Sequence, residues 1–184
     1  MARYDLPKAA PEPLRRVQLF VNTVDFEHER EWLATPAALA DWFEENGFEL
    51  GAPVTDADLR LAIELREALR ALLRANNGRA LPDGAVAAVN HAAHAAGLAA
   101  ELDGSGNVVL EQSASGVDGA LGRILAIAFA SLLDGSWSRL KACRNCGWIF
   151  HDYSRKRSAG WCSMAICGNR LKTKAYRNRL SGRR

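Results

Sequence analysis

The chain has 184 residues, 48% of them hydrophobic, a composition that supports a folded core and excludes wholesale disorder. The net charge of +3 hides two opposed parts: residues 1–138 carry 11 Lys and Arg against 20 Asp and Glu, whereas residues 139–184 carry 13 against one. The longest apolar run, residues 124–133, is about half of a membrane span, and the N-terminus lacks the apolar run of a secreted precursor. We therefore expect a cytoplasmic protein without a membrane partner.

The N-terminal segment begins with an arm and two predicted helices. Residues 1–13 contain three prolines and few apolar residues, which predicts a flexible arm. Residues 14–24 are mostly apolar and favour a helix over a strand. A second helix is expected to begin at Thr35-Pro36, where a capping residue precedes proline, and to end at Gly47.

The clearest predicted helix follows. It begins at Thr55, which has an acidic variant of the capping box in Asp58, and leucines recur along it at helical spacing until residues 76–78. Pro82 then opens an alanine-rich helix that is expected to end at Gly97.

The pattern changes in the next segment. Between residues 98 and 112, short apolar stretches flank a glycine-rich loop, which predicts a β-hairpin. The helix expected after Ser115 is apolar on nearly every side, as in a central core helix. We predict a mainly α fold with one β-hairpin (α+β), in which a helical domain, residues 14–137, precedes a small treble-clef-like zinc module, residues 138–184.

The four cysteines carry the strongest functional signal. Their spacing is Cys-x2-Cys-x15-Cys-x4-Cys, and in a reducing compartment such clustering favours a metal over disulfides or free thiols. We predict that Cys143, Cys146, Cys162 and Cys167 bind one Zn²⁺ ion. Four thiolates close its coordination sphere, so the ion is expected to be structural rather than catalytic. His151 is expected to face the solvent instead of replacing a cysteine.

The local order of elements around the cysteines is also predicted. Residues 143–147 form a knuckle that Gly147 closes, and residues 148–153 are expected to start a short hairpin. A helix is expected from Trp161, with Cys162 and Cys167 in its first turns. Asn169 is predicted to support the site by bonding a knuckle carbonyl; the alternative is an ordinary surface asparagine.

The basic residues of the module exceed what the metal site needs. A zinc tetrathiolate carries a charge of about −2, which Arg144 and Arg170 are candidates to offset. The remaining charge favours nucleic acid over a merely solvated surface, and a helix would place Arg170, Lys174 and Arg177 on one side. The predicted nucleic-acid contacts are Arg155, Lys156, Arg157, Arg170, Lys172, Lys174, Arg177 and Arg179.

A family resemblance rests on these motifs. Trp161-Cys162-Ser163-Met164 followed by Cys167-Gly168-Asn169-Arg170 resembles the CGNR zinc finger, named for that tetrad, and the resemblance covers residues 139–180. In that family the finger usually follows a helical domain called ABATE, which Phe20-Val21-Asn22-Thr23 resembles more weakly. The resemblance implies a stress-induced transcription regulator.

The N-terminal domain shows no catalytic set. It has no phosphate loop, no nucleophile elbow and no paired His-Glu metal motif, so we expect no enzyme. His91 and His94 are expected at the surface, and Asn22 is expected to cap a helix. Arg66 and Arg70 are expected to form surface ion pairs, with a cleft or an anion site as the alternative.

Together these features predict a DNA-binding transcription regulator. Its zinc module would contact double-stranded DNA, while its N-terminal domain would sense a small-molecule or anionic effector or form a homodimer. The alternatives are a protein–protein adaptor that docks through the zinc module and an RNA-binding protein. We also hypothesise that the acidic domain rests against the basic tail until DNA competes for it.

Overall fold

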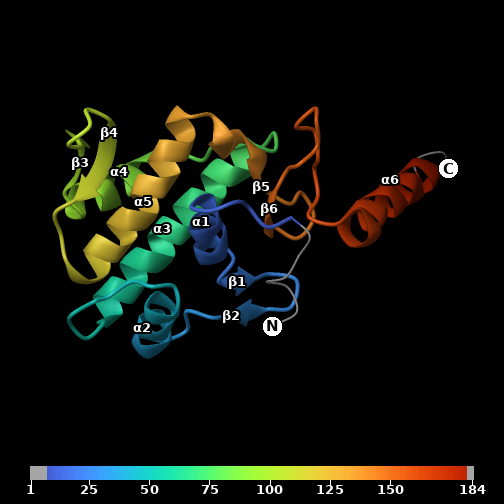
Figure 1. Cartoon of the computed structure of the whole chain (residues 1–184). Helices are drawn as coiled ribbons and strands as arrows, with labels where there is room; N and C mark the ends of the chain where they lie inside the picture. Colours follow the sequence, from blue (N-terminus) through green and yellow to red (C-terminus); the bar gives the residue numbers. More distant parts are fainter. Residues whose placement is uncertain (1–7, 182–184) are drawn as a thin grey trace.

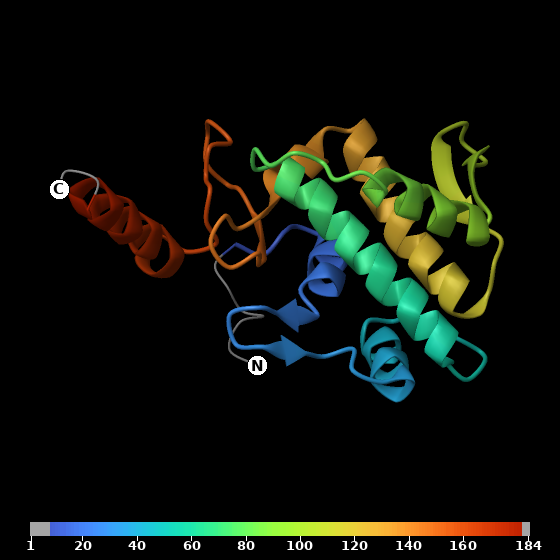
Figure 2. The ribbon, with the colours of Figure 1, turned by 180° about the vertical axis from the view of Figure 1, so that it is seen from behind.

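The computed structural model describes residues 8–181, apart from the side chains at positions 174, 175 and 179–181. Three helices, α3 (Asp56–Ala75), α4 (Ala85–Ala95) and α5 (Gly116–Leu133), pack side by side (Figure 1). The shorter α1 (Leu14–Val21) lies against α3 and α5, and α2 (Pro36–Glu45) packs on α3. The same bundle seen from behind shows α4 and the adjoining hairpin at the end remote from the C-terminus (Figure 2).

The predicted N-terminal caps of two helices are present, and two other helix boundaries differ from the prediction. The Thr35 hydroxyl accepts a hydrogen bond from the N–H of Ala38, and the Thr55–Asp58 capping box is complete. The helix predicted from residue 14 ends earlier than expected, at Val21. The alanine-rich helix begins later, because Gly84 adopts a positive φ of 88° immediately before it.

Within residues 8–181, three antiparallel strand pairs accompany the helices. β3 (Leu98–Leu102) and β4 (Val108–Gln112) form the predicted hairpin. Two further pairs were not predicted in this form: β1 (Val24–Asp25) with β2 (Arg30–Glu31), and β5 (Leu140–Ala142) with β6 (Ile149–His151). Residues 149–151 are thus the second strand of a hairpin that encloses the knuckle, whereas we expected them to start one.

Helix α5 is the core helix that its composition predicted, although not along its whole length. Ile124 and Leu125 are fully buried, whereas Leu132 and Leu133 in the last turn are exposed. The helix is long and apolar enough to meet a compositional test for a membrane span. Half of it is buried within the fold, as is usual for the core helix of a globular domain.

The hairpin β5–β6 separates two apolar clusters. Leu140, Ala142 and Ile149 point into the core of the helical bundle, while Phe150 on the other face packs with the cysteines. The alternation follows from the period of two along a strand. The register pairs His151 with Leu140, so His151 is 95% buried and the prediction that it faces the solvent is wrong.

Candidate metal centre and basic helix

The structure brings the four cysteines into one buried cluster. All four sulfur atoms lie within 4.8 Å of one another, and three of the separations are 3.6–3.7 Å: Cys146 to Cys162, Cys162 to Cys167 and Cys167 to Cys146. Sulfurs at the corners of a tetrahedron with Zn–S bonds of about 2.3 Å are about 3.8 Å apart. The cluster therefore has the donor type, number and spacing of a closed tetrathiolate zinc site.

The crowding of the four thiols affects how readily they lose their protons. Hydrogen bonding to Cys143 raises the pKa of Cys146 to about 12, and neighbouring Cys143 and Cys146 raise the pKa of Cys162 as well. Four adjacent thiolates would repel one another unless a cation lay between them. Zinc binding therefore has to displace protons from this cluster, and it becomes weaker as the pH falls.

Two glycines fit the backbone around the sulfurs. Gly147 closes the knuckle with a φ of +74°, and its N–H donates to the carbonyl of Cys143. Gly168 follows Cys167 in a π-helical turn, Met164–Gly168, where a Cβ would lie 2.4 Å from Sδ of Met164 and 3.1 Å from the Trp161 ring. A glycine at position 168 therefore lets the turn pack tightly on that ring.

The turn that presents Cys167 differs from the predicted helix start. The π-helical turn begins after Ser163, whose hydroxyl accepts a hydrogen bond from the N–H of Ile166, and it leads directly into α6 (Asn169–Ser181). Cys162 accordingly lies in irregular backbone before the turn, not in the first turn of a helix. A side-chain cap at Ser163 explains why helical geometry cannot extend back to Trp161.

The residue that supports the sulfurs was also misassigned. Asn169 is exposed and donates to the carbonyl of Ala165 one turn earlier, so it does not bond the knuckle. Asn145, a residue of the knuckle, supports a ligand instead: its Nδ2 lies 3.5 Å from Sγ of Cys167. Arg144 directs Nε to the carbonyl of Asn77, 3.1 Å away.

Comparison with protein families assigns both parts of the chain. Residues 14–136 match the ABATE family, described as "Putative stress-induced transcription regulator", and residues 139–180 match the CGNR zinc finger. The chain belongs to the ABATE family. A search of curated proteins found no match. With the CGNR assignment and four buried cysteines at ligand distance, the finger contains one structural zinc ion. Both families are of regulator or zinc-finger type.

Side-chain amides join the ABATE domain to the CGNR finger. The amide of Asn22 donates to the carbonyl of Ile149 and accepts from its N–H, at 3.0 and 2.8 Å. Asn77 donates to the carbonyls of Ala142 and Gly160, at 2.8 and 3.0 Å. Both asparagines are almost completely buried, so these bonds pair buried polar groups of one domain with those of the other.

Two arginines of α3 are buried, which contradicts the expected surface pairing. Arg66 forms a bidentate ion pair with Glu31 and a second ion pair with Glu67. Arg70 is fully buried, contacts Glu67, and donates to the carbonyls of Val21 and Gly147. Burial lowers the pKa of Arg70, and Glu67 opposes this effect. Arg70 thus connects α3 of the ABATE domain to the zinc knuckle.

The N-terminal arm is ordered where the structure describes it. Lys8 donates to the carbonyl of Trp161 and lies over the Phe150 ring, and Tyr153 donates its hydroxyl to the carbonyl of Ala9. Residues 8–9 therefore lie against the CGNR finger and are not a loose arm; residues 1–7 are outside the described part of the chain.

The single acidic residue of the finger organises its basic loop. Asp152 is buried and accepts from Lys141 and from the N–H groups of Ser154 and Ala159, at 2.8–2.9 Å. Burial acts to raise the pKa of Asp152, but these hydrogen bonds lower it to about 2. The ionised carboxylate thereby fixes both ends of the segment that carries Arg155, Lys156 and Arg157 at the surface.

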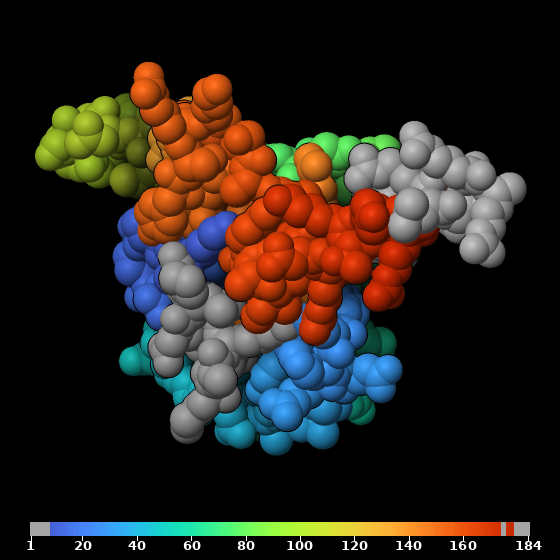
Figure 3. Space-filling view, turned by 90° about the vertical axis from the view of Figure 1, so that its right-hand side faces the viewer, coloured from blue at the N-terminus to red at the C-terminus, as the bar shows by residue number. Residues whose placement is uncertain are grey.

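Helix α6 extends away from the bundle (Figure 1). Arg170, Lys172 and Arg177 are exposed on it, and Arg170 and Arg177 line one shared groove, as their spacing predicted. The side chains of Lys174 and Arg179 are outside the described residues. The helix begins beside the ABATE domain (Figure 3). There Arg170 forms an ion pair with Glu27, which lies between β1 and β2.

Proposed function

We propose that this protein is a cytoplasmic transcription regulator that binds double-stranded DNA through the basic surface of its CGNR finger. In this proposal the four cysteines bind the zinc ion that fixes α6 to the finger. Arg170, Lys172 and Arg177 on α6, with Arg155, Lys156 and Arg157 on the adjoining loop, contact phosphates. All six of these side chains are exposed and so are accessible to a ligand. The ABATE domain acts as a ligand-sensing domain or as an interaction domain that forms a homodimer.

One observation carries the proposal. The 13-residue helix α6 contains five Lys and Arg and no acidic residue, and it projects from the bundle immediately after a metal ligand. A protruding helix of this kind has the diameter and charge to enter the major groove of DNA, whose phosphates attract it. A solvated surface helix would have no physical reason to exclude acidic residues.

Salt dependence tests the electrostatic part of the proposal. If four to six phosphates are neutralised, log affinity plotted against log salt has a slope of roughly −4 to −5 in duplex DNA. Arg170→Ala with Arg177→Ala should make the slope less negative by about 2. Fluorescence anisotropy of zinc-loaded full-length protein measures the slope for the wild type and for the double variant. Arg60→Ala on α3 is the matched surface control. A slope near zero would eliminate nucleic acid as the partner.

Structured RNA is the second probe in the same assay, because the charge alone does not distinguish the two nucleic acids. Tighter binding to RNA than to duplex DNA at the same salt concentration would replace DNA by RNA in the proposal. A protein adaptor has its own support in two exposed apolar residues next to α6, Met164 and Ile166. A partner that is captured after nuclease treatment, with no measurable nucleic-acid affinity, would favour that function.

The ion pair between Glu27 and Arg170 supports competition between the ABATE domain and DNA. Glu27 hydrogen-bonds Arg170 and raises its pKa, and the same guanidinium is a proposed phosphate contact. Glu27→Gln should therefore strengthen DNA binding about two- to fivefold at low salt, an effect that disappears when Arg170→Ala is added. Unchanged affinity in Glu27→Gln would show that the domain does not compete.

A further inference from the structure

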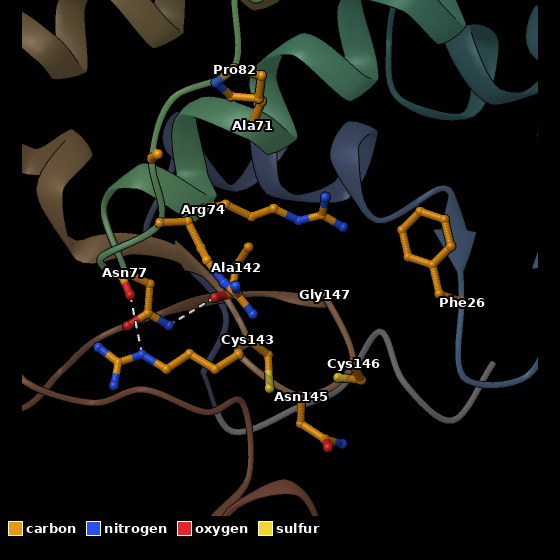
Figure 4. Close-up of a pocket in the computed structure, with 13 residues that line it drawn as sticks. Phe26, Ala71, Arg74, Asn77, Pro82, Ala142, Cys143, Asn145, Cys146 and Gly147 are labelled. Atoms are coloured by element: carbon orange, nitrogen blue, oxygen red, sulfur yellow. Dashed lines mark hydrogen bonds between the residues drawn. The ribbon is translucent and has the colours of Figure 1, made fainter. Parts of the chain in front are cut away.

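A cavity lies between the ABATE domain and the zinc knuckle. Its volume is about 450 Å³, which falls within the range of small-ligand sites. One wall comes from the end of α3 and the loop after it, and the other from the knuckle itself (Figure 4). Ligand sites are frequent at such domain boundaries.

Three arginines line this cavity, Arg74, Arg79 and Arg144, and none of its lining residues is acidic. Arg66, Arg70 and Arg74 are spaced four residues apart on α3, so they follow one side of the helix. The first two have carboxylate partners. Within residues 8–181, Arg74 and Arg79 have no carboxylate partner, although both are close enough to the knuckle to line the same space.

The positions of the guanidinium groups are partly fixed. Nη2 of Arg74 is 3.5 Å from where a Cβ on Gly147 would stand, next to the ring of Phe26. Arg144 packs across Gly160, and its Nε is held by the carbonyl of Asn77. Its Nη2 lies 3.6 Å from where a Cβ on Gly78 would stand, at the loop after α3. Holding an arginine by one nitrogen before a ligand arrives reduces the entropy lost on binding.

The remaining wall is apolar. Phe26 is half exposed, with the Arg70 guanidinium 4.9 Å from its ring centre, and Ala71 and Pro82 lie on the ABATE side. A cavity with three cations and an aromatic wall suits a dianionic group attached to a compact ring. Arginine matches the oxygens of a phosphate with paired hydrogen bonds, and three such cations favour a dianion over a single carboxylate.

The charge of the metal site does not explain all three arginines. A zinc tetrathiolate would attract nearby cations, and Arg144 lies next to two of the cysteines in sequence. Arg74 and Arg79 come from the ABATE side of the cavity, where the side chain of Arg74 reaches toward Gly147 and Phe26. Because Arg144 and Arg170 already match a charge of about −2, Arg74 and Arg79 are cations beyond what the metal site needs.

We propose that this cavity binds a phosphate group, with Arg74, Arg79 and Arg144 as its donors and Phe26 beside the organic part of the ligand. The inference deepens the proposed function, because it locates an anionic effector where it would contact both the ABATE domain and the finger. The phosphate belongs either to a small phosphomonoester or to the backbone of bound nucleic acid. Both sources offer phosphate oxygens to the arginines, as a dianion in the phosphomonoester and as a monoanion in the backbone diester.

Calorimetry with zinc-loaded full-length protein tests the site without nucleic acid. Phenyl phosphate is the first probe and inorganic phosphate the second, and we expect a Kd of about 1 mM or tighter for phenyl phosphate. Arg74→Ala and Arg79→Ala should each weaken binding about tenfold, since each removes charged hydrogen bonds. Phe26→Ala should weaken phenyl phosphate several-fold and leave inorganic phosphate unchanged.

Arg60→Ala is the matched control. Arg60 is exposed on the same helix, 14 residues or about 21 Å before Arg74. The Arg60→Ala protein should therefore bind phenyl phosphate as tightly as the wild type does. Because Arg74 and Arg79 are themselves exposed, their variants are expected to fold, which an unchanged thermal midpoint and zinc content would verify. Equal binding by wild type and the Arg74→Ala, Arg79→Ala double variant would overturn the site.

Duplex DNA separates the two sources of phosphate. If both small anions fail to bind and the double variant weakens DNA binding about as much as Arg170→Ala with Arg177→Ala does, the cavity takes a backbone phosphate. If neither small anions nor DNA distinguish the double variant from wild type, the inference is wrong. Binding of phenyl phosphate without any DNA affinity would support the site while removing the proposed DNA-binding function.

Discussion

The ABATE domain and the CGNR finger are stabilised by different means, although they meet in one structure. The domain buries leucine, isoleucine and phenylalanine side chains from four helices, whereas the finger has a small cluster of two aromatic side chains and four cysteines. Between them, β5–β6 contributes apolar residues to the domain on one face and to the metal site on the other. The finger is therefore not an independent module attached by a linker: both strands of its hairpin contribute residues to the core of its neighbour.

Removing the metal should cause the largest loss of stability, in the finger and in the ABATE domain that it contacts. Cys162→Ala or a strong chelator should unfold the finger, because structural zinc contributes about 10–16 kcal/mol of apparent binding free energy in small fingers. The ABATE domain should also lose stability, since Asn22, Asn77 and Arg70 would lose backbone partners. Zinc content and urea unfolding followed by tryptophan fluorescence measure both effects.

His94→Ala is the control for the metal prediction. His94 is exposed on α4 and is not one of the cysteine ligands. The His94→Ala protein should therefore retain one zinc ion and the stability of the wild type. If the Cys162→Ala protein loses zinc but its urea unfolding curve does not shift, the finger does not stabilise the ABATE domain. That result would contradict the inference that the two share a core.

The second-largest effect is expected at Arg70. Arg70→Met keeps the length of the side chain but leaves the carbonyls of Val21 and Gly147, and one oxygen of Glu67, without their donor. Breaking a buried charged contact in this way costs about 3–5 kcal/mol. Arg60→Met on the exposed side of α3 should change the unfolding free energy by less than about 0.5 kcal/mol. Equal effects of the two variants would contradict the connecting role of Arg70.

Asn22 should have a smaller and more local effect. Asn22→Ala removes two hydrogen bonds to Ile149 and leaves its N–H buried without a partner, at a cost of about 2–3 kcal/mol. Asn90→Ala, at an exposed position on α4, is the control and should be nearly neutral. Amide hydrogen exchange at Ile149 should accelerate in Asn22→Ala only; unchanged protection there would show that the amide does not hold the strand.

The sequence predicts the elements whose signals are local. Thr35, Thr55 and Asp58 cap helices where expected, and the glycine-rich loop joins the predicted hairpin. The cysteine spacing predicted the metal cluster because a tetrahedral ion requires four donors near one another.

What the sequence could not predict depends on contacts between distant segments. Asn22 and Asn77 follow helices, where capping is the local explanation, but their amides reach strands more than 60 residues away. The cavity is formed mainly by two segments about 70 residues apart. The alternative prediction of a cleft or an anion site named Arg66 and Arg70, neither of which lines it. His151 was misplaced for the same reason, because a strand register decides which face a residue occupies.

His151 gives the smallest predicted effect and tests how tightly the two regions pack. Burial lowers its pKa, with a further contribution from Arg139, and its Nδ1 is buried without a hydrogen-bond partner among the described residues. The unfolded state, with a pKa near 6.5, then takes up a proton before the folded state does. Stability should be complete above pH 6.5 and should fall as the pH drops through the lowered pKa.

His151→Leu removes both the proton uptake and the unpaired nitrogen. Its unfolding free energy at pH 7.5 should be equal to or slightly above that of the wild type, because no buried polar atom is left unsatisfied. Between pH 7.5 and 5.5 the wild type should lose stability relative to the variant, by less than the worth of one buried hydrogen bond, about 1 kcal/mol. The difference between the two proteins cancels the loss of zinc affinity that both undergo on acidification. Parallel pH profiles would mean that water reaches His151, and therefore that the finger does not seal against the ABATE domain.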